Sequence, residues 1–200
     1  MENTINYGID LGTTNSAIAK FVKGEVIIFS NPQKMGTRTL PSIVGYKKDK
    51  ILVGEQARVF AEKEPENVKS VFKRKMGTSE SFPVKSLNQS KTPIELSTEI
   101  LKELKTFVNT SDNLDAVVIT IPASFDTVQS IATKRSRYTS WICSSGFTTR
   151  TNCSKLSLRQ YEERKEMQNG QWLVYDLGGG TFGGINQNQR WRNECFRPRG

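Results

Sequence analysis

The stretch Ile9-Asp10-Leu11-Gly12-Thr13-Thr14 stands near the start of the 200-residue chain, and a related stretch, Tyr175-Asp176-Leu177-Gly178-Gly179-Gly180-Thr181, stands near its end. Both contain an apolar residue followed by Asp, Leu and Gly, and both close on Thr. Each follows a short run of residues typical of a β-strand. The repeat therefore predicts two adjacent strands that each end in an aspartate, Asp10 and Asp176, and turn through loops of glycine and threonine that face one cleft.

The residue types of these loops suit a polyphosphate. Glycine lets the backbone approach a ligand closely, and successive N–H groups in such a turn form an anion-binding nest. Threonine hydroxyls add donors, and Asp10 and Asp176 can face a hydrated Mg²⁺, which prefers few protein oxygens and several waters. The sequence lacks the G-x-x-x-x-G-K-[ST] pattern of a Walker loop. One such turn is ordinary at a strand end, but the recurrence favours a clamp for phosphates and their metal.

Hydrophobic periodicity predicts an α/β fold around the two loops. The expected strands cover residues 5–12, 17–22, 25–29, 116–122 and 172–175, with a hairpin turn at 23–24. The expected helices cover residues 56–63 and 94–108, and a third begins at Thr127 with Asp126 as its N-cap. The apolar run at 116–122 is typical of a strand buried on both faces. Residues 135–164 and those after Phe182 show neither helical nor strand periodicity.

Several segments, taken with the two loops, resemble one family. They are residues 8–16, 40–44 (Leu-Pro-Ser-Ile-Val), 53–54, 73–77 (Lys-Arg-Lys-Met-Gly) and 118–125 (Val-Ile-Thr-Ile-Pro-Ala-Ser-Phe). In combination they resemble the ATPase domain of the DnaK-type heat-shock protein 70 chaperones, within the actin and sugar-kinase superfamily. The resemblance covers residues 5–134 and 166–182. It implies an α/β, actin-like ATPase (ribonuclease H-like) fold, of which the chain would hold the first lobe only, incomplete.

The resemblance implies roles for single residues. Asp10 and Asp176 would hold the Mg²⁺ shell, largely through water, and Lys73 would position the attacking water and the γ-phosphate. Asp10 and Thr181 would complete the catalytic set with Lys73. The phosphate-contacting residues would be Gly12, Thr13, Thr14, Asn15, Gly178, Gly179, Gly180 and Thr181. Without the resemblance, Lys73 lies in a basic cluster, residues 73–75, and would be interpreted as a solvated surface charge.

The resemblance also implies an organisation and a set of partners. Residues 1–182 would form the first lobe, with a core subdomain of 1–38 and 113–182 and a peripheral subdomain of 39–112. The cofactors would be ATP or ADP, Mg²⁺ and, as an additional ion, K⁺. Partners would be unfolded client peptides, a J-domain co-chaperone and a nucleotide exchange factor, whose main binding regions are missing here. No apolar stretch reaches 18 residues and no signal-peptide pattern opens the chain, so a cytoplasmic protein without membrane attachment is expected.

Two windows depart from this pattern, and we term them the aberrant segment (135–164) and the aberrant tail (183–200). The formal net charge is +9. Residues 134–165 carry eight Lys or Arg and two Glu, and the tail carries four Arg and one Glu, so the rest of the chain is neutral. The cysteines, at 143, 153 and 195, also fall here and match no zinc or disulfide pattern.

Back-translation of the protein sequence offers an explanation for both windows. With free choice of wobble bases, removal of one base near Lys134 can restore a helix, an apolar β-run and the Glu-Pro-Ile-Ala-Ala block that the family expects. The same shift after Phe182 can produce alternating strands. A frameshift and a genuine divergent insert both remain open, and the frameshift is the preferred hypothesis.

Three functions are consistent with these observations. The first is the ATP-binding part of a DnaK-type chaperone, with hydrolysis impaired because Gly183 replaces the family's Asp and the Glu-Pro block is missing. The alternative is a non-functional, truncated frameshift product with at most weak phosphate binding. A sugar-kinase-like ATPase shares the two loops but not the segments 73–77 and 117–125. The basic composition suggests a nucleic-acid binder, but the excess charge is confined to residues 134–165 and 183–200, so no nucleic-acid partner is expected.

Overall fold

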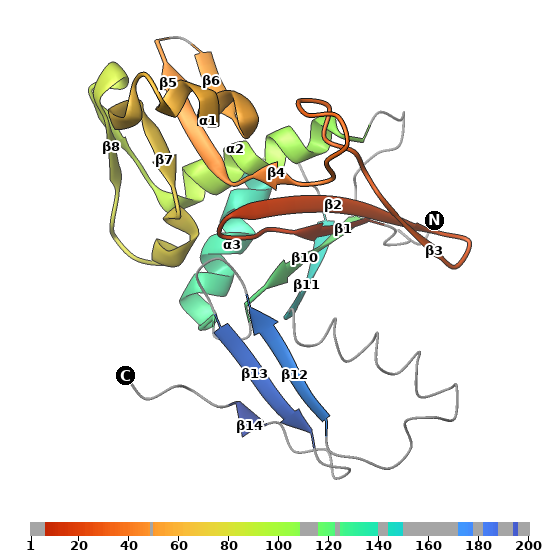
Figure 1. Cartoon of the computed structure of the whole chain (residues 1–200). Helices are drawn as coiled ribbons and strands as arrows, with labels where there is room; N and C mark the ends of the chain where they lie inside the picture. The colour runs from red at the N-terminus through yellow and green to blue at the C-terminus, as the bar shows by residue number, and fades with distance from the viewer. Residues whose placement is uncertain are drawn as a thin grey trace.

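The computed structural model describes residues 7–48, 50–108, 116–122, 125–139, 144–149, 172–177, 182–187 and 194–195, and after residue 136 it describes the backbone only. A mixed β-sheet forms its centre, in the strand order β11-β10-β1-β2-β3 (Figure 1). β1 pairs antiparallel with β2 and parallel with β10, and β10 pairs parallel with β11. The strands are β1 (Tyr7–Asp10), β2 (Asn15–Val22), β3 (Glu25–Ile28), β10 (Ala116–Ile121) and β11 (Ser144–Thr149).

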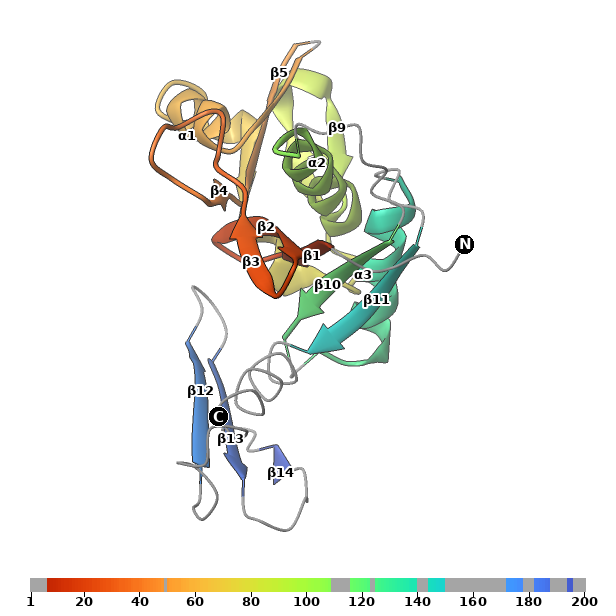
Figure 2. The same ribbon diagram turned by 90° about the vertical axis from the view of Figure 1, so that its right-hand side faces the viewer.

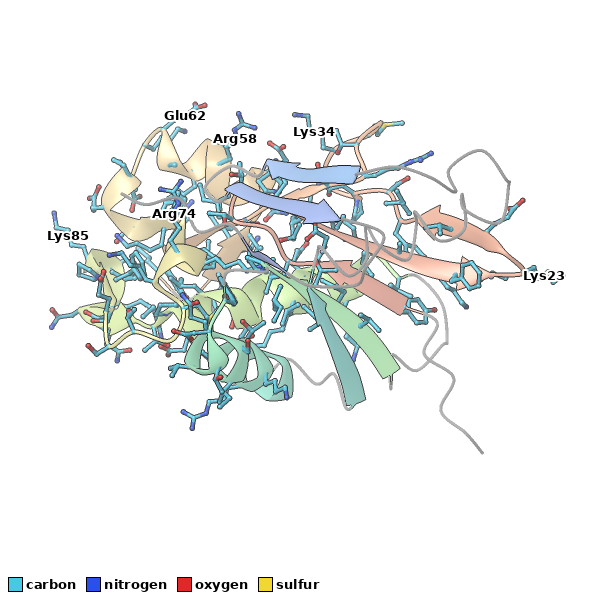
Figure 3. All side chains as sticks on the ribbon, turned by 90° about the horizontal axis from the view of Figure 1, so that it is seen from below. Lys23, Lys34, Arg58, Glu62, Arg74 and Lys85 are labelled. Carbon is cyan, nitrogen blue, oxygen red and sulfur yellow. The ribbon has the colours of Figure 1, made fainter. Side chains whose placement is uncertain are left out.

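The β2–β3 hairpin turns at the two residues that the sequence indicates. Lys23 and Gly24 have φ values of 50° and 85°. Two successive positive φ values are the mark of a type I′ turn, which matches the right-handed twist of the flanking strands. Lys23 lies at the tip of this hairpin (Figure 3).

A second, smaller layer covers residues 40–91. Its three-stranded sheet has the order β6-β5-β7, and the hairpin β8–β9 lies next to it (Figure 1). Helix α1 (Glu55–Ala61) buries Ala57 and Phe60 against this sheet. The strands are β4 (Leu40–Pro41, paired with β2), β5 (Ile43–Lys47), β6 (Lys50–Val53), β7 (Val68–Ser70), β8 (Phe82–Val84) and β9 (Gln89–Lys91). Three 3₁₀ turns link them: η1 (Pro65–Asn67), η2 (Phe72–Lys75) and η3 (Lys85–Leu87).

Helix α2 (Pro93–Thr106) joins the two layers through one apolar face. Its start is fixed by a capping box between Thr92 and Glu95. The residues that point inward are Leu96, Ile100, Leu101 and Leu104, each fully buried in the main core beside Ile9 and Ile119 of the central sheet. The prediction of an amphipathic helix over 94–108 is confirmed.

Helix α3 (Thr127–Thr139) begins where the sequence indicates, and the Asp126 carboxylate accepts a hydrogen bond of 2.8 Å from the Gln129 N–H. It packs on α2, where the Thr98 hydroxyl donates to the Ser136 carbonyl. The predicted helix at 56–63 and the predicted strands are likewise present, with boundaries shifted by a few residues.

The aberrant segment and the aberrant tail, which show no periodicity in the sequence, hold some regular structure among the residues that the structure describes. α3 runs on to Thr139, β11 lies beside β10 in the central sheet, and the tail contributes β13 (Phe182–Gln187) and β14 (Glu194–Cys195). The physical reason is tertiary: a paired neighbour strand supplies backbone hydrogen bonds to a segment that lacks a hydrophobic period of its own. β10, an apolar strand with a free edge, is that neighbour for β11.

Strand β12 (Trp172–Leu177) lies outside the central sheet. It forms a separate antiparallel sheet with β13 and β14, which Figure 2 shows beyond the end of β10 and β11. We expected Asp10 and Asp176 to end adjacent strands. The sheet order shows instead that their strands belong to different sheets.

Candidate phosphate-binding site

The loop between β1 and β2 turns within four residues. Leu11 is 2% exposed and anchors the loop in the core, and Thr13 is also buried. Asp10, Thr14 and Asn15 are exposed. Because Leu11 packs into the core while Asp10 and Thr14 are exposed, the loop presents a carboxylate and a hydroxyl to solvent at the edge of the sheet.

Two buried serines hold this loop in one conformation. The Gly12 N–H donates to the Ser16 Oγ at 3.1 Å, and the Ser42 Oγ donates to the Gly12 carbonyl at 2.9 Å. The two hydroxyl oxygens lie 2.9 Å apart, and the Ser42 N–H donates to the Thr14 carbonyl at 2.8 Å. The N–H of Gly12 is therefore engaged inside the protein, so in this conformation the predicted Gly12–phosphate contact does not use it as a donor.

Asp10 is oriented by the neighbouring strand. Thr120 of β10 donates its hydroxyl to Asp10 Oδ1 at 2.8 Å. The two residues are register partners in the parallel pair β1–β10, so both strands deliver polar groups to the same edge. The carboxylate is exposed at this edge, where it can face a hydrated cation. Thr120 was not among the predicted site residues, although one polar residue between two isoleucines of an apolar strand is a usable signal.

Lys73 is buried, at 2% exposure, in η2. Its ammonium lies 5.6 Å from the centre of the Phe125 ring, a cation–π distance. The interpretation of Lys73 as a solvated surface charge, which the residues alone favoured, is therefore wrong. Its neighbours Arg74 and Lys75 are the exposed members of the cluster.

The Lys73 segment is seated on the start of α3. Gly77 has φ +82°, and a Cβ there would lie 3.0 Å from the Gln129 backbone nitrogen. Phe125 stands just before α3 and four residues after the end of β10. The segment 72–77 thus contacts the chain that leaves the sheet edge carrying Asp10 and Thr120.

Of the two predicted loops, the structure describes the first in full and the second only in part. Asp10, Gly12, Thr13, Thr14 and Asn15 come together on one loop. Asp176 lies in β12, where only its backbone is described, and residues 178–181 lie outside the described residues. Within the described ranges, no cluster of three or more His, Cys, Asp or Glu side chains could hold a metal ion.

Other features of the described chain do not add to the site. Two surface cavities, of about 560 and 230 Å³, lie at β8–β9 and beside Tyr46, and neither is lined by a residue of the loop. None of the described helices is long and apolar enough to cross a membrane.

The central sheet is mixed, and its first strand ends in an exposed aspartate that is followed by a fixed Gly-Thr loop. These features define an α/β protein with a strand-end loop suited to anions. The model of the family "Hsp70 protein" matches residues 6–184, and the chain belongs to this family. Its fold is therefore of the actin-like ATPase class, of which the chain forms an incomplete part. The match runs across residues 135–164, which the sequence motifs alone did not connect to the family.

The relatives agree with this membership. The chain is 36% identical over 184 residues to "Chaperone protein DnaK" of Ureaplasma urealyticum serovar 10, covering 91% of this chain and 29% of the relative. The protein of the same name in Mycoplasmopsis pulmonis is 37% identical, with 91% and 29% coverage. That of Mycoplasmoides gallisepticum is 35% identical, with 90% and 30% coverage. The chain thus spans less than a third of the length of these relatives.

Proposed function

We propose that this chain is the ATP-binding part of a DnaK-type chaperone, impaired in hydrolysis. The observation that carries the proposal is the fixed loop from Asp10 to Ser16, with its exposed carboxylate and hydroxyl. Within the described part of the chain, the N–H groups of Thr13 and Thr14 donate no hydrogen bond. Unengaged N–H groups beside threonine hydroxyls fit a phosphate chain, and one oriented carboxylate fits a Mg²⁺ that keeps most of its waters.

Individual residues take separate tasks in this proposal. Thr13 and Thr14 would bind phosphate oxygens through N–H and hydroxyl groups, and Asp10, held by Thr120, would accept hydrogen bonds from water on Mg²⁺. The buried Lys73 would place its charge near the terminal phosphate, a role that the family implies. Bound ATP with Mg²⁺ would supply the phosphoryl group. Because such transfer depends on positioning and electrostatic stabilisation, every missing partner lowers the rate.

The impairment has a structural argument at Gly183. Asp176 and Gly183 are register partners in the antiparallel pair β12–β13. Side chains at such positions share a face with Cβ atoms about 4.5–5.5 Å apart. The family's Asp at this position would therefore stand beside Asp176, and glycine removes that carboxylate.

The wider activity belongs to the same proposal. ATP-driven capture and release of client peptides, a J-domain co-chaperone, a nucleotide exchange factor, a K⁺ site and a cytoplasmic location are proposed from the family alone. The family match favours the chaperone over the sugar-kinase alternative. The non-functional frameshift product remains the second candidate, since the charge and cysteine anomalies favour it.

Calorimetric titration of the chain with MgADP and MgATP tests the proposal. We expect weak binding that Asp10→Asn reduces, together with phosphate release at background level. Gly183→Asp is expected to strengthen the Mg²⁺ dependence of nucleotide binding, because it restores a carboxylate beside Asp176. Absence of any Mg²⁺-dependent binding by the folded chain would favour the non-functional alternative, and turnover at the level of a complete chaperone domain would contradict the impairment.

A further inference from the structure

The phosphate loop is fixed from outside itself. Ser42 follows β4 in the peripheral layer and lies 30 residues along the chain from Gly12, yet its hydroxyl and its N–H both bond the loop backbone. β4 also pairs with the start of β2, Leu40 opposite Ser16. Ser16 and Ser42 are 1% and 4% exposed, so water does not compete for these bonds.

The donors and acceptors around Gly12 allow one arrangement of hydrogens. Each serine hydroxyl has one hydrogen to donate. Ser42 donates its hydrogen to the Gly12 carbonyl, so in the contact between the two hydroxyls Ser16 is the donor. Ser16 in turn accepts from the Gly12 N–H. The result is a closed ring, which we term the Gly12 ring: Gly12 N–H to Ser16 to Ser42 and back to Gly12 C=O.

The ring determines which loop groups face outward. Glycine is the residue with the most backbone freedom, so Gly12 by itself would leave the loop in many conformations. Because both polar groups of Gly12 are turned into the protein, the following N–H groups, those of Thr13 and Thr14, are the ones left for a ligand. Bonds in such a chain polarise one another, and losing any one member weakens the rest.

We propose that Ser42 is a positioning residue for the nucleotide phosphates: it contacts no ligand and acts by closing the Gly12 ring. The inference rests on the proposed function, since it assigns that loop to phosphate. It also makes the peripheral layer part of the site, because the strand that carries Ser42 into place is β4. Displacement of β4 would open the ring and release the loop.

The test is a double-mutant cycle with Ser42→Ala, Ser16→Ala and the double variant in the full chain, titrated with MgADP and with magnesium tripolyphosphate. Loss of a net hydrogen bond corresponds to about a tenfold loss of affinity for Ser42→Ala. Ser16→Ala should cost about as much, and the double variant little more, because both open the same ring. Ser86→Ala is the matched control, since Ser86 donates a similar bond, 2.8 Å, to the Tyr46 carbonyl away from the loop. It should lower thermal stability and leave affinity unchanged.

Hydrogen exchange separates failure of this inference from failure of the proposed function. Without nucleotide, the Gly12 amide should exchange about tenfold faster in Ser42→Ala than in the unaltered chain or Ser86→Ala. If the amide responds but no variant binds nucleotide, the ring stands and the proposed ligand is wrong. If Ser42→Ala is folded and binds as the unaltered chain does, or the two serine effects add, the positioning role is wrong. Should Ser42→Ala not fold, Ser16→Ala alone decides, by the same amide and affinity measurements.

Discussion

Gly54 is the position where one added methyl group is expected to damage both the fold and the loop. It precedes α1 with φ +68° and ψ −131°, a conformation that L-residues rarely adopt. A Cβ there would overlap Leu40 Cδ1 and lie 2.9 Å from Gln33 Oε1. The backbone strain costs about 1–3 kcal/mol and the overpacking about 1–3 kcal/mol more. Gly54→Ala should therefore lower the free energy of unfolding by about 2–6 kcal/mol, a large share of a domain's 5–15 kcal/mol.

The same substitution should reach the phosphate loop. Leu40 is fully buried in β4, and Gln33 accepts a hydrogen bond from the Glu55 N–H at the start of α1. Moving Leu40 shifts the strand that precedes Ser42, so phosphate affinity should fall even where the variant still folds.

Urea unfolding followed by far-UV circular dichroism is the assay, because all three tryptophans lie after residue 140 and report elsewhere. Gly36→Ala is the matched control. Gly36 has φ +78°, and a Cβ there would meet no other atom of the described chain within 4 Å, so this variant tests strain without crowding. Its expected cost is about 1–2 kcal/mol. If Gly54→Ala costs no more than Gly36→Ala, the steric argument fails.

Three further substitutions test other parts of the molecule. Phe125→Leu removes the ring beside the Lys73 ammonium and should lower MgATP affinity three- to tenfold, about the value of a cation–π contact, with a smaller effect on MgADP. Phe125→Tyr keeps the ring and should bind normally, and equal losses of affinity in the two variants would contradict a role for the ring. Ser97 is fully buried, and within the described part of the chain its Oγ has no hydrogen-bond partner. Ser97→Ala should therefore raise the stability measured by thermal unfolding by about 1 kcal/mol. A loss of stability would show that the hydroxyl has a hydrogen-bond partner. Thr92→Ala should cost about 1 kcal/mol of stability at neutral pH. Partial burial raises the pKa of Glu95, but hydrogen bonds from Thr92 and Lys91 outweigh it and lower that pKa below its ordinary value of 4.5. A carboxyl group whose pKa is lower in the folded state stabilises that state above the unfolded pKa, and this stabilisation is lost as the pH falls through the folded pKa. The difference in stability between Thr92→Ala and the unaltered chain should therefore shrink below about pH 4.5. A difference that does not depend on pH would show that Glu95 is not involved.

The sequence predicted those elements whose signal lies within a short segment. The apolar run at 116–122, the stripe of α2 and the Asp126 cap each depend on spacing alone, and each is present. The burial of Lys73 was not predictable from its basic neighbours, because it depends on Phe125, far along the chain. β11 was missed for a similar reason, since its order comes from pairing with β10.

The missed site residues share one property. Ser16, Ser42 and Thr120 are hydroxyl residues, and serine and threonine occur throughout this sequence without distinction of role. Their roles follow from bonds to groups 4, 30 and 110 positions away. Only the three-dimensional pairing of β4 with β2 and of β10 with β1 makes those bonds possible.

The positions at which the sequence departs from the family motifs affect nucleotide binding and hydrolysis differently. β1 carries Asp10 and has a paired strand on both sides, β2 and β10, and β10 is covered in turn by β11 from the aberrant segment. The first loop therefore keeps its support although the sequence beside it departs from the family motifs. The carboxylate loss that the proposed function invokes falls on the other sheet, where Gly183 is the register partner of Asp176. Under the proposed function, the fixed first loop can hold a phosphate chain weakly. Without a carboxylate at position 183, the chain would lack one of the groups that position the metal for phosphoryl transfer. Such a chain should retain weak nucleotide binding and lose hydrolysis, because the two depend on different sheets.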